Sequence, residues 1–230
     1  MEFSNITVIV PTLNEEQNIG RLIDKIQELY PGIHIVVVDD GSTDKTTDIV
    51  REKSKKYPNV RLLDRQSEPV KGLTISIRDG ILHTETEWFI IMDGDFQHPP
   101  ESIQDAIACM DQDPDLIIGR RDHIEEWPFT RKLISVGAQT LGKISLLLRR
   151  KQIPKDIMSG FFGGKTSVLT KYAENDKILE FTGYKFLFDV LKVFPKDGKI
   201  CEFGYVFRNR EYGTSKIGKK QIIAFLKSLI

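Results

Sequence analysis

Residues 88–95, with the sequence Trp-Phe-Ile-Ile-Met-Asp-Gly-Asp, decide the fold. The five apolar residues predict a buried strand, and this strand leads directly into two carboxylates separated by one glycine. A strand that is apolar on both faces is typical of a parallel sheet covered by helices on both sides. Such sheets bind their ligands beyond the carboxyl ends of the strands. The stretch therefore predicts both an α/β fold and the place of a polar site.

The segments around this stretch repeat the same pattern. We expect further strands at 6–10, 33–38, 60–63 and 116–118, separated by helices that start near 14, 44, 72 and 99. Asn14, with Gln17 three residues later, is typical of a capped helix start. The βαβαβ order predicts a mainly parallel sheet covered by helices. Polar residues then meet at one edge, because residues 11–15, Asp39-Asp40 and Asp93-Gly94-Asp95 all follow strands.

The second half of the chain is less regular. Residues 127–150 form a long stretch in which apolar residues recur at helical spacing between basic ones. We expect another helix at 181–194, an alternating strand at 200–207 and an apolar last segment at 221–230. The sequence has no run of 18 apolar residues, which excludes a membrane-spanning helix within it. No N-terminal signal is visible either, because Glu2 and Asn5 interrupt any apolar leader.

Charge is spread unevenly over the 230 residues, although 33 basic and 33 acidic side chains cancel. Residues 1–126 hold 13 Lys/Arg and 25 Asp/Glu, whereas residues 127–155 hold seven basic side chains and no acidic one. Residues 208–230 are also basic. This distribution indicates an anionic partner, such as a phosphorylated lipid or a membrane surface. The alternative is a chance excess on solvated helices.

The two cysteines, Cys109 and Cys201, lie far apart in the sequence. They fit neither a disulfide framework nor a zinc site, and we therefore expect a reducing compartment.

The acidic loop carries the most specific chemistry. Asp93 and Asp95 at a strand end can both reach one divalent cation, and Gln97 adds a neutral oxygen. Mg²⁺ or Mn²⁺ held in this way keeps positions open for diphosphate oxygens. The alternative is a loop with two solvated aspartates. At Asp39-Asp40, contacts to a ribose or a base compete with a helix-capping role, and different residues can fill both roles.

Other motifs exclude two nucleotide-binding classes. The sequence has no Gly-x-Gly-x-x-Gly after the first strand and no Gly-x-x-x-x-Gly-Lys-[Ser/Thr], which argues against a dinucleotide oxidoreductase and a P-loop NTPase. Arg121, Arg131, Arg210 and Lys216 are candidates for phosphate contacts. The histidines show no metal-ligand spacing, and His98 is expected to pack or cap beside the acidic loop.

Several of these motifs together resemble family 2 glycosyltransferases with the GT-A fold. The motifs are VIVPTLNE at 8–15, VVDDGS at 37–42, KGL at 71–73, MDGDFQHPPE at 92–101 and SGFF at 159–162. Residues 127–135 (WPFTRKLIS) and 207–216 are further similar to polyprenyl-phosphate glycosyltransferases, above all dolichol-phosphate mannose synthases. The resemblance implies one catalytic domain, 1–230, with a nucleotide-sugar-binding half at 1–120 and an acceptor-binding half with amphipathic interface helices at 121–230.

The resemblance also implies roles for single residues. The nucleotide-sugar site comprises Pro11, Leu13, Glu15, Val38, Asp40, Asp93, Gly94, Asp95, Lys185, Arg210 and Lys216. Arg121, Arg131 and Ser135 match positions near the acceptor phosphate, and Asp95, Arg121 and Arg131 are the expected catalytic residues. Asp93, Asp95 and Gln97 match the metal loop. Two departures are Leu13, where an aromatic residue is frequent, and Gly94, where alanine is usual.

The implied reaction is metal-dependent, inverting transfer of a hexose, mannose from GDP-mannose, to dolichyl or polyprenyl phosphate. No nucleic acid takes part, and the enzyme would act at the cytoplasmic face of a membrane. Relatives often continue into membrane-spanning helices, so either a trimmed chain or a monotopic enzyme fits the end at Ile230. Between Arg210 and Lys216, Gly213 predicts a loop that is mobile until donor binds.

Three alternatives stay open. A UDP-sugar-dependent family 2 enzyme could make dolichyl-phosphate glucose, or add sugar to a carbohydrate hydroxyl. The hydroxyl acceptor would need a carboxylate base, for which Asp156 and Glu180 are the candidates. A nucleotidyltransferase would need a Gly-rich basic loop after the first strand, where the chain has Asn14-Glu15-Glu16. A non-catalytic membrane-binding protein would bind lipid but no nucleotide.

Overall fold

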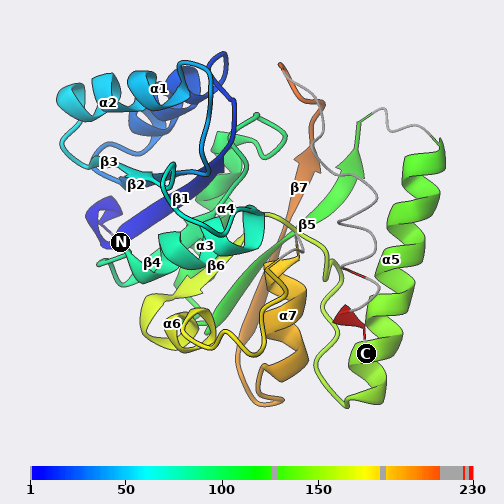
Figure 1. Ribbon diagram of the computed structural model, residues 1–230. Coiled ribbons are helices and arrows are strands. Elements are labelled where there is room, and N and C mark those ends of the chain that lie inside the picture. Colours follow the sequence, from blue (N-terminus) through cyan, green and yellow to red (C-terminus); the bar gives the residue numbers. More distant parts are fainter. Residues whose placement is uncertain (1, 126–128, 182–184, 213–224, 226–227, 230) are drawn as a thin grey trace.

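A mixed sheet forms the centre of the molecule (Figure 1). The computed structural model describes residues 2–125, 129–181, 185–212, 225 and 228–229. Within them the sheet has seven strands in the order β3-β2-β1-β4-β6-β5-β7. The strands are β1 (Ile6–Thr12), β2 (His34–Asp39), β3 (Val60–Asp64), β4 (Trp88–Ile91), β5 (Leu116–Ile124), β6 (Phe162–Lys165) and β7 (Ile200–Phe207). Only the pairs that β6 makes with β4 and β5 are antiparallel, so the prediction of a mainly parallel sheet is confirmed.

Helices cover both faces of this sheet. One face packs against α1 (Ile19–Leu29), α2 (Thr46–Lys56) and α4 (Ile103–Met110). Two short 3₁₀ turns, η1 (Phe3–Asn5) and η2 (Pro100–Ser102), come directly before β1 and α4. The other face packs against α3 (Leu73–Leu82), α6 (Thr166–Ala173) and α7 (Phe186–Val193). The buried Val and Ile side chains of β1, β2 and β4 alternate between the two apolar cores. This alternation explains why their sequences read as continuous apolar runs.

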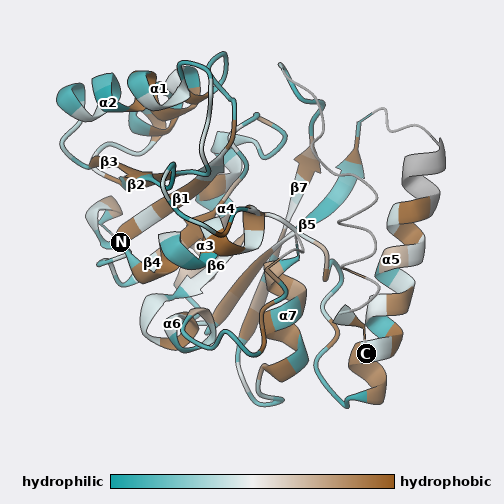
Figure 2. Ribbon diagram, in the orientation of Figure 1, coloured by the Kyte–Doolittle hydropathy of each residue, from teal (hydrophilic) through white to brown (hydrophobic). Residues whose placement is uncertain are grey.

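The long helix α5 (Phe129–Leu148) stands to one side of this core, beside α7 (Figure 2). Leu146 is fully buried. Leu141, Ile144, Leu147 and Leu148 expose 46%, 48%, 63% and 79% of their surface. The exposure of these four residues agrees with the amphipathic interface helix expected in this half of the chain, because residues packed on the protein's own core would be buried. No helix in the described residues is long and apolar enough to cross a bilayer.

Some predicted element boundaries need correction. The helix expected from Asn14 begins at Ile19, and no capping box forms. Asn14 instead has a positive φ of 53° and its side-chain oxygen accepts the backbone N–H of Thr43 at 2.8 Å. The side chain is therefore used between two loops rather than within one helix. The helix predicted at 181–194 begins at Phe186, and residues 182–184 lie outside the described part of the chain.

The interpretation of the cysteines is wrong. Cys109 at the end of α4 and Cys201 at the start of β7 form a disulfide, with their Cα atoms 5.8 Å apart. The fold brings α4 against β7, and a pairing across 92 residues cannot be seen from local sequence. The expectation of a reducing compartment therefore loses its basis.

Candidate functional site

The candidate site lies at the carboxyl ends of β1, β2 and β4. These parallel strands end next to one another and deliver Thr12, Asp39 and the loop Asp93-Gly94-Asp95 to one edge. The loop packs closely on β1, because a Cβ atom on Gly94 would lie 3.3 Å from Thr12 Cγ2 and 3.5 Å from Val10 Cγ1. A small residue at position 94 thus lets the two carboxylates sit tight against the sheet.

The carboxyls of Asp93 and Asp95 hold their protons unusually tightly. Burial raises the pKa of Asp95 to about 6, and the neighbouring Asp93 raises it further against the opposing effect of Arg210. The pKa of Asp93 also rises to about 6 because of burial, although Arg210, Lys185 and Arg121 oppose the rise. Two acids and three cations therefore meet at this edge of the sheet, as the sequence predicts.

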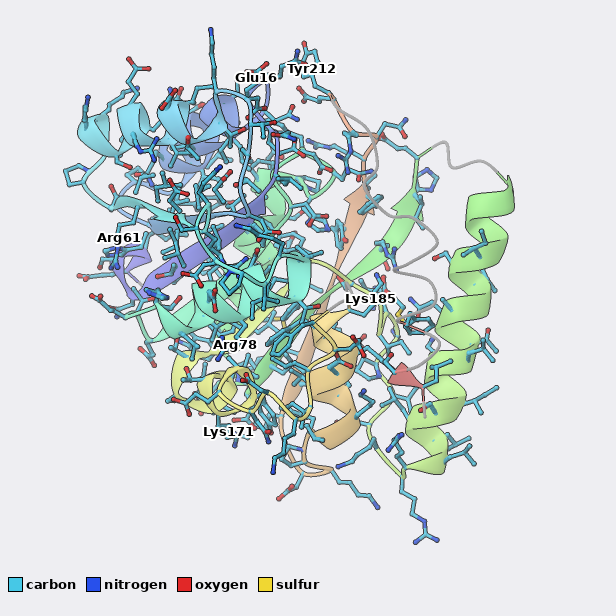
Figure 3. The ribbon with its side chains drawn as sticks, viewed as in Figure 1. Glu16, Arg61, Arg78, Lys171, Lys185 and Tyr212 are labelled. Atoms are coloured by element: carbon cyan, nitrogen blue, oxygen red, sulfur yellow. A yellow bond between two sulfur atoms is a disulfide. The ribbon has the colours of Figure 1, made fainter. Side chains whose placement is uncertain are left out.

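Arg210 is the cation that touches the acidic loop directly. Its Nη2 atom lies 2.7 Å from Asp95 Oδ2, and its Nη1 atom lies 3.6 Å from Glu15 Oε1. The second oxygen of Asp95, Oδ1, accepts the backbone N–H of Gln97 at 3.0 Å. Gln97 also donates its side-chain amide to Arg208 O, so it braces the loop that carries Arg210. Figure 3 shows Tyr212 of this loop near Glu16, where Asn18 donates to Tyr212 O.

His98 has the packing role that was expected for it. Its ring contacts Phe161, Tyr205 and Phe207, and only 1% of the residue is exposed. The Nδ1 atom accepts the backbone N–H of Asp93 at 2.9 Å. Burial lowers the pKa of His98 to about 3, which keeps the imidazole neutral. His98 therefore holds the backbone of the acidic loop through Asp93 from within the buried aromatic cluster.

Asp39 and Asp40 have different surroundings at the end of β2. Asp39 is fully buried and accepts the backbone N–H groups of Gly41 and Ser42, so it shapes the turn after β2. Asp40 is partly exposed, and it accepts the backbone N–H of Gly72 at 2.6 Å and a contact from Arg65 Nη1. Burial raises the pKa of Asp40 while Gly72 and Arg65 oppose the rise. The side chain of Asp40 is 10% exposed, and its two oxygens contact Arg65 and Gly72, so its nucleoside role stays a prediction.

Arg65 was missed by sequence reasoning. Only 2% of this residue is exposed, and its guanidinium contacts Asp40, Asp79 and Ser76, as well as Val70 O. A buried arginine without a motif around it has no signal in a single sequence. Its partners come from β2, α3 and the loop before α3, and only the fold brings them together.

Arg121 at the end of β5 is paired with Asp156. The guanidinium donates to both carboxylate oxygens, at 2.6 Å and 2.8 Å, and Gln139 of α5 donates to the same carboxylate. Burial favours protonation of Asp156, but the hydrogen bonds from Arg121 hold its pKa below the usual value. Lys185 lies nearby and donates to Met158 O at 2.7 Å. Figure 3 shows Lys185 between α7 and the inner side of α5.

The remaining predicted site residues are less informative. Pro11 and Leu13 are half-buried at the end of β1. Val38 is fully buried within the core, so only its backbone can face a ligand. Ser135 is half-buried in α5, and Arg131 lies in the same helix with its side chain outside the described part. Lys216, and the predicted mobile loop beyond Tyr212, lie outside the described residues as well.

The acidic loop fits a divalent metal ion. Among the described residues no group of three His, Cys, Asp or Glu side chains is arranged as a metal site. Two carboxylates whose pKa values rise through burial and mutual repulsion are nevertheless ligands that a cation would relieve. Gly160 packs beside the acidic loop, since a Cβ atom there would lie 3.2 Å from His98 Cε1 and 3.6 Å from Asp93 Oδ2. The sequence motif Ser159-Gly160 therefore belongs to the site.

Comparison with protein families gives one match over most of the chain. The model described as glycosyl transferase family 2 matches residues 7–173. Among curated proteins, a dolichol-phosphate mannosyltransferase from Pyrococcus furiosus is 36% identical over 230 residues, covering 97% of this chain. The chain spans 62% of the length of that relative. A polyprenol monophosphomannose synthase from Mycolicibacterium smegmatis is 29% identical over 222 residues, covering 94% of this chain and 82% of the relative.

Solved structures with similar folds are also glycosyltransferases. Glucosyl-3-phosphoglycerate synthase from Mycobacterium tuberculosis, with Mn²⁺, UDP and phosphoglyceric acid bound, has a TM-score of 0.67 and 19% identity, covering 99% of this chain and 80% of that one. A mannosyltransferase from Pyrobaculum calidifontis, with GDP-Man and Mn²⁺ bound, has a TM-score of 0.60 and 19% identity, covering 90% and 56%. At these identities the likeness concerns the fold.

Proposed function

Because this chain belongs to glycosyl transferase family 2, and is thus a glycosyltransferase with the GT-A fold, we propose that it transfers mannose from GDP-mannose to dolichyl or polyprenyl phosphate. The names of the curated relatives support this sugar and this acceptor. The observation that carries the proposal is the charge arrangement of the site. The buried carboxylate of Asp95 and the partly exposed carboxylate of Asp93 lie near three cations, Arg121, Lys185 and Arg210. This arrangement suits a reaction between two phosphate-bearing substrates.

The residues divide into a donor side and an acceptor side. On the donor side, Pro11, Leu13, Glu15, Asp40 and the backbone of Val38 hold the nucleoside. Asp93, Gly94 and Asp95 lie at the diphosphate, with Lys185, Arg210 and Lys216 as its cations. On the acceptor side, Arg121, Arg131 and Ser135 bind the lipid phosphate. The half 1–120 of the single domain carries the nucleoside and metal residues. The half 121–230 carries the acceptor residues and also contributes the three cations of the donor side.

The proposed reaction needs no strong base. A phosphate oxygen of the lipid is already ionised, and it attacks the anomeric carbon while the bond to the nucleoside diphosphate breaks on the opposite side. An α-linked donor thus gives a β-linked product. Arg210 and Lys185 stabilise the negative charge that develops on the leaving diphosphate. Mg²⁺ or Mn²⁺, when bound by Asp93, Asp95 and Gln97, would supply further positive charge there.

The state of Asp156 disfavours a sugar-hydroxyl acceptor. That reaction requires a carboxylate that takes up a proton, and Asp156 was one of the two candidates. Its low pKa and its two hydrogen bonds from Arg121 make it a weak base. Asp156 is better suited to orienting Arg121 for a phosphate.

Membrane contact is part of the same proposal. The exposed apolar residues of α5 and its excess of basic side chains fit a helix that lies at a lipid surface, which is where a polyprenyl phosphate is found. We place the enzyme at the cytoplasmic face, where the nucleotide sugar would be supplied.

A transfer assay tests the proposal. Purified protein is incubated with dolichyl phosphate and Mg²⁺ or Mn²⁺, with GDP-mannose in one arm and UDP-glucose in the other, and the lipid product is extracted and identified. We expect product from GDP-mannose and dolichyl phosphate only when metal is present. Product from UDP-glucose alone would support the alternative donor. Transfer to a free sugar hydroxyl without lipid phosphate would contradict the proposed acceptor.

A further inference from the structure

The guanidinium of Arg210 lies beside Asp95, where the divalent metal ion is expected to bind. Its Nη2 atom lies 2.7 Å from Asp95 Oδ2, and the side chains of Asp95 and Glu15, its two acidic partners, expose only 3% and 8% of their surface. Arg210 itself is 21% exposed. The guanidinium thus compensates the negative charges of these two buried carboxylates.

The backbone around Arg210 is fixed to the site on several sides. The backbone N–H of Arg208 donates to Gln97 O at 3.1 Å, and Gln97 donates back to Arg208 O at 3.2 Å. Asn209 N donates to Glu125 at 3.0 Å, and Glu211 pairs with Arg21 of α1 at 2.7 Å. Arg210 is therefore held at the acidic loop by its own chain, and only its side chain has to move for the guanidinium to leave Asp95.

A guanidinium and a divalent ion compete for the same carboxylate oxygen. The N–H group occupies one of the two lone pairs of Asp95 Oδ2, and a guanidinium and a metal ion bound to the same oxygen repel each other. A diphosphate changes the balance, because its oxygens match the fork of the guanidinium and are more negative than a carboxylate. On this basis we propose that the guanidinium of Arg210 occupies the position of the metal ion at Asp95 in the unliganded protein. When metal and donor bind together, Arg210 leaves Asp95 and binds the diphosphate.

This inference rests on the proposed function and adds a second role for Arg210. Without nucleotide, Arg210 opposes metal binding at Asp93 and Asp95. With nucleotide, the same residue supports it by binding the diphosphate that the metal shares. Metal and nucleotide are then coupled through one side chain, and each raises the affinity for the other by the same factor.

Mn²⁺ binding tests this role without any measurement of activity. Free Mn²⁺ is followed by electron paramagnetic resonance during titration of the wild-type protein, Arg210→Gln, Arg210→Lys and Arg208→Gln, each with no nucleotide, with GDP and with UDP. Arg208 is the matched control, because its guanidinium pairs with the exposed Glu101 two residues before Arg210. Thermal melting checks that each variant is folded.

We expect Arg210→Gln to raise the Mn²⁺ affinity without nucleotide and to lower it with nucleotide. Without nucleotide, Arg210→Gln binds Mn²⁺ about tenfold more tightly than wild type, since one charge-assisted contact no longer competes. With nucleoside diphosphate it binds Mn²⁺ about tenfold more weakly. Arg210→Lys keeps the positive charge and stays close to wild type without nucleotide, and Arg208→Gln changes neither value. The inference is overturned if Arg210→Gln binds Mn²⁺ no more tightly than wild type without nucleotide, including the case in which neither binds. Wild-type protein that binds neither GDP nor UDP would contradict the proposed function instead, and the nucleotide-free titration would still decide the role of Arg210.

Discussion

The buried carboxylate of Asp95 lowers the stability of the unliganded protein at neutral pH. Only 3% of its side chain is exposed, and burial raises its pKa from 3.8 to about 6. The folded chain therefore binds this proton more tightly than the unfolded chain does. Between about pH 4 and about pH 6, Asp95 binds more protons in the folded state than in the unfolded state. The free energy of unfolding therefore falls as the pH rises through this window.

Replacement of Asp95 by Asn should therefore separate stability from function. At pH 7.5 and without metal, we expect Asp95→Asn to raise the free energy of unfolding by about 1–3 kcal/mol, because the desolvated charge is removed. The gain should vanish below about pH 4, where the wild-type carboxyl is protonated. Urea denaturation at several pH values measures it. With Mn²⁺ and GDP the order should reverse, since the variant, like Asp95→Ala, loses metal-dependent donor binding. A variant with normal turnover would refute the metal assignment.

Arg65 should contribute strongly to both stability and donor affinity. Its removal leaves the carboxylates of Asp40 and Asp79 without their shared cation, and breaking a buried ion pair costs about 3–5 kcal/mol. We expect this loss for Arg65→Met in urea denaturation, against less than about 1 kcal/mol for Arg61→Met, whose ion pair with Glu85 is exposed.

Arg65→Lys tests the link from Arg65 to the nucleoside side. A lysine keeps the charge but cannot reach the four partners of the planar guanidinium at once, so Asp40 loses orientation. We expect a higher KM for the donor with little change in kcat. An unchanged KM would mean that Arg65 only holds the loop before α3.

At the level of elements, strands buried on both faces were predicted well, because their apolar runs end in recognisable loops. The antiparallel strand β6 was not predicted. It is four residues long and contains Gly163-Gly164, which sequence patterns assign to a turn. The glycines are needed because β6 fits between neighbouring strands, and a Cβ atom on Gly163 would lie 2.0 Å from Phe89 O. The requirement comes from the partner strand, which local sequence does not contain.

In the candidate site, too, some residues could be predicted from local sequence and others depend on distant partners. Asp93, Asp95 and Arg210 were predicted because they stand in motifs at strand ends, and the structure brings them together. Arg65 was not singled out, because its partners come from elements far away in the chain and no motif surrounds it. Motif-bearing residues can thus be predicted from the sequence, whereas the residues that support them need the fold.

Helix α5 offers a test at the level of a single element. Among the leucines of α5 whose side chains the structure describes, Leu147 and Leu148 are the most exposed, and basic residues follow them at Arg149 and Arg150. We expect the wild-type protein to float with anionic liposomes at low salt and less so at high salt. The double variant Leu147→Glu/Leu148→Glu should lose this binding, whereas Val70→Glu, at a 46% exposed valine before α3, should keep it. Equal flotation of both variants would rule out α5 as the contact.

At the scale of the whole molecule, β6 and β7 unite the two halves of the chain. β6 pairs with β4 of the first half, and β7 pairs with β5 along eight residues. The loop after β7 then returns to α1 and the acidic loop, where Arg21 pairs with Glu211. The donor-side residues at the ends of β1, β2 and β4 and the acceptor-side Arg121 of β5 therefore rest on one continuous sheet, which supports the proposal of a single catalytic domain.

The disulfide between Cys109 and Cys201 lies at the start of β7, at the end of the strand far from Arg210. It ties α4 to the edge strand β7, whose other end leads to Arg210. A cross-link over 92 residues restricts the unfolded chain, and removal of a native disulfide typically costs about 2–5 kcal/mol. We expect Cys109→Ser/Cys201→Ser to lower the free energy of unfolding by this amount, and dithiothreitol to do the same to the wild type but not to the double variant. Because β7 remains paired with β5 along its length, nucleotide affinity at 25 °C should change less than twofold. Equal stability of the oxidised and reduced wild type would show that the cross-link adds nothing to the fold, and a large loss of nucleotide affinity would show that α4 positions the loop of Arg210 through β7.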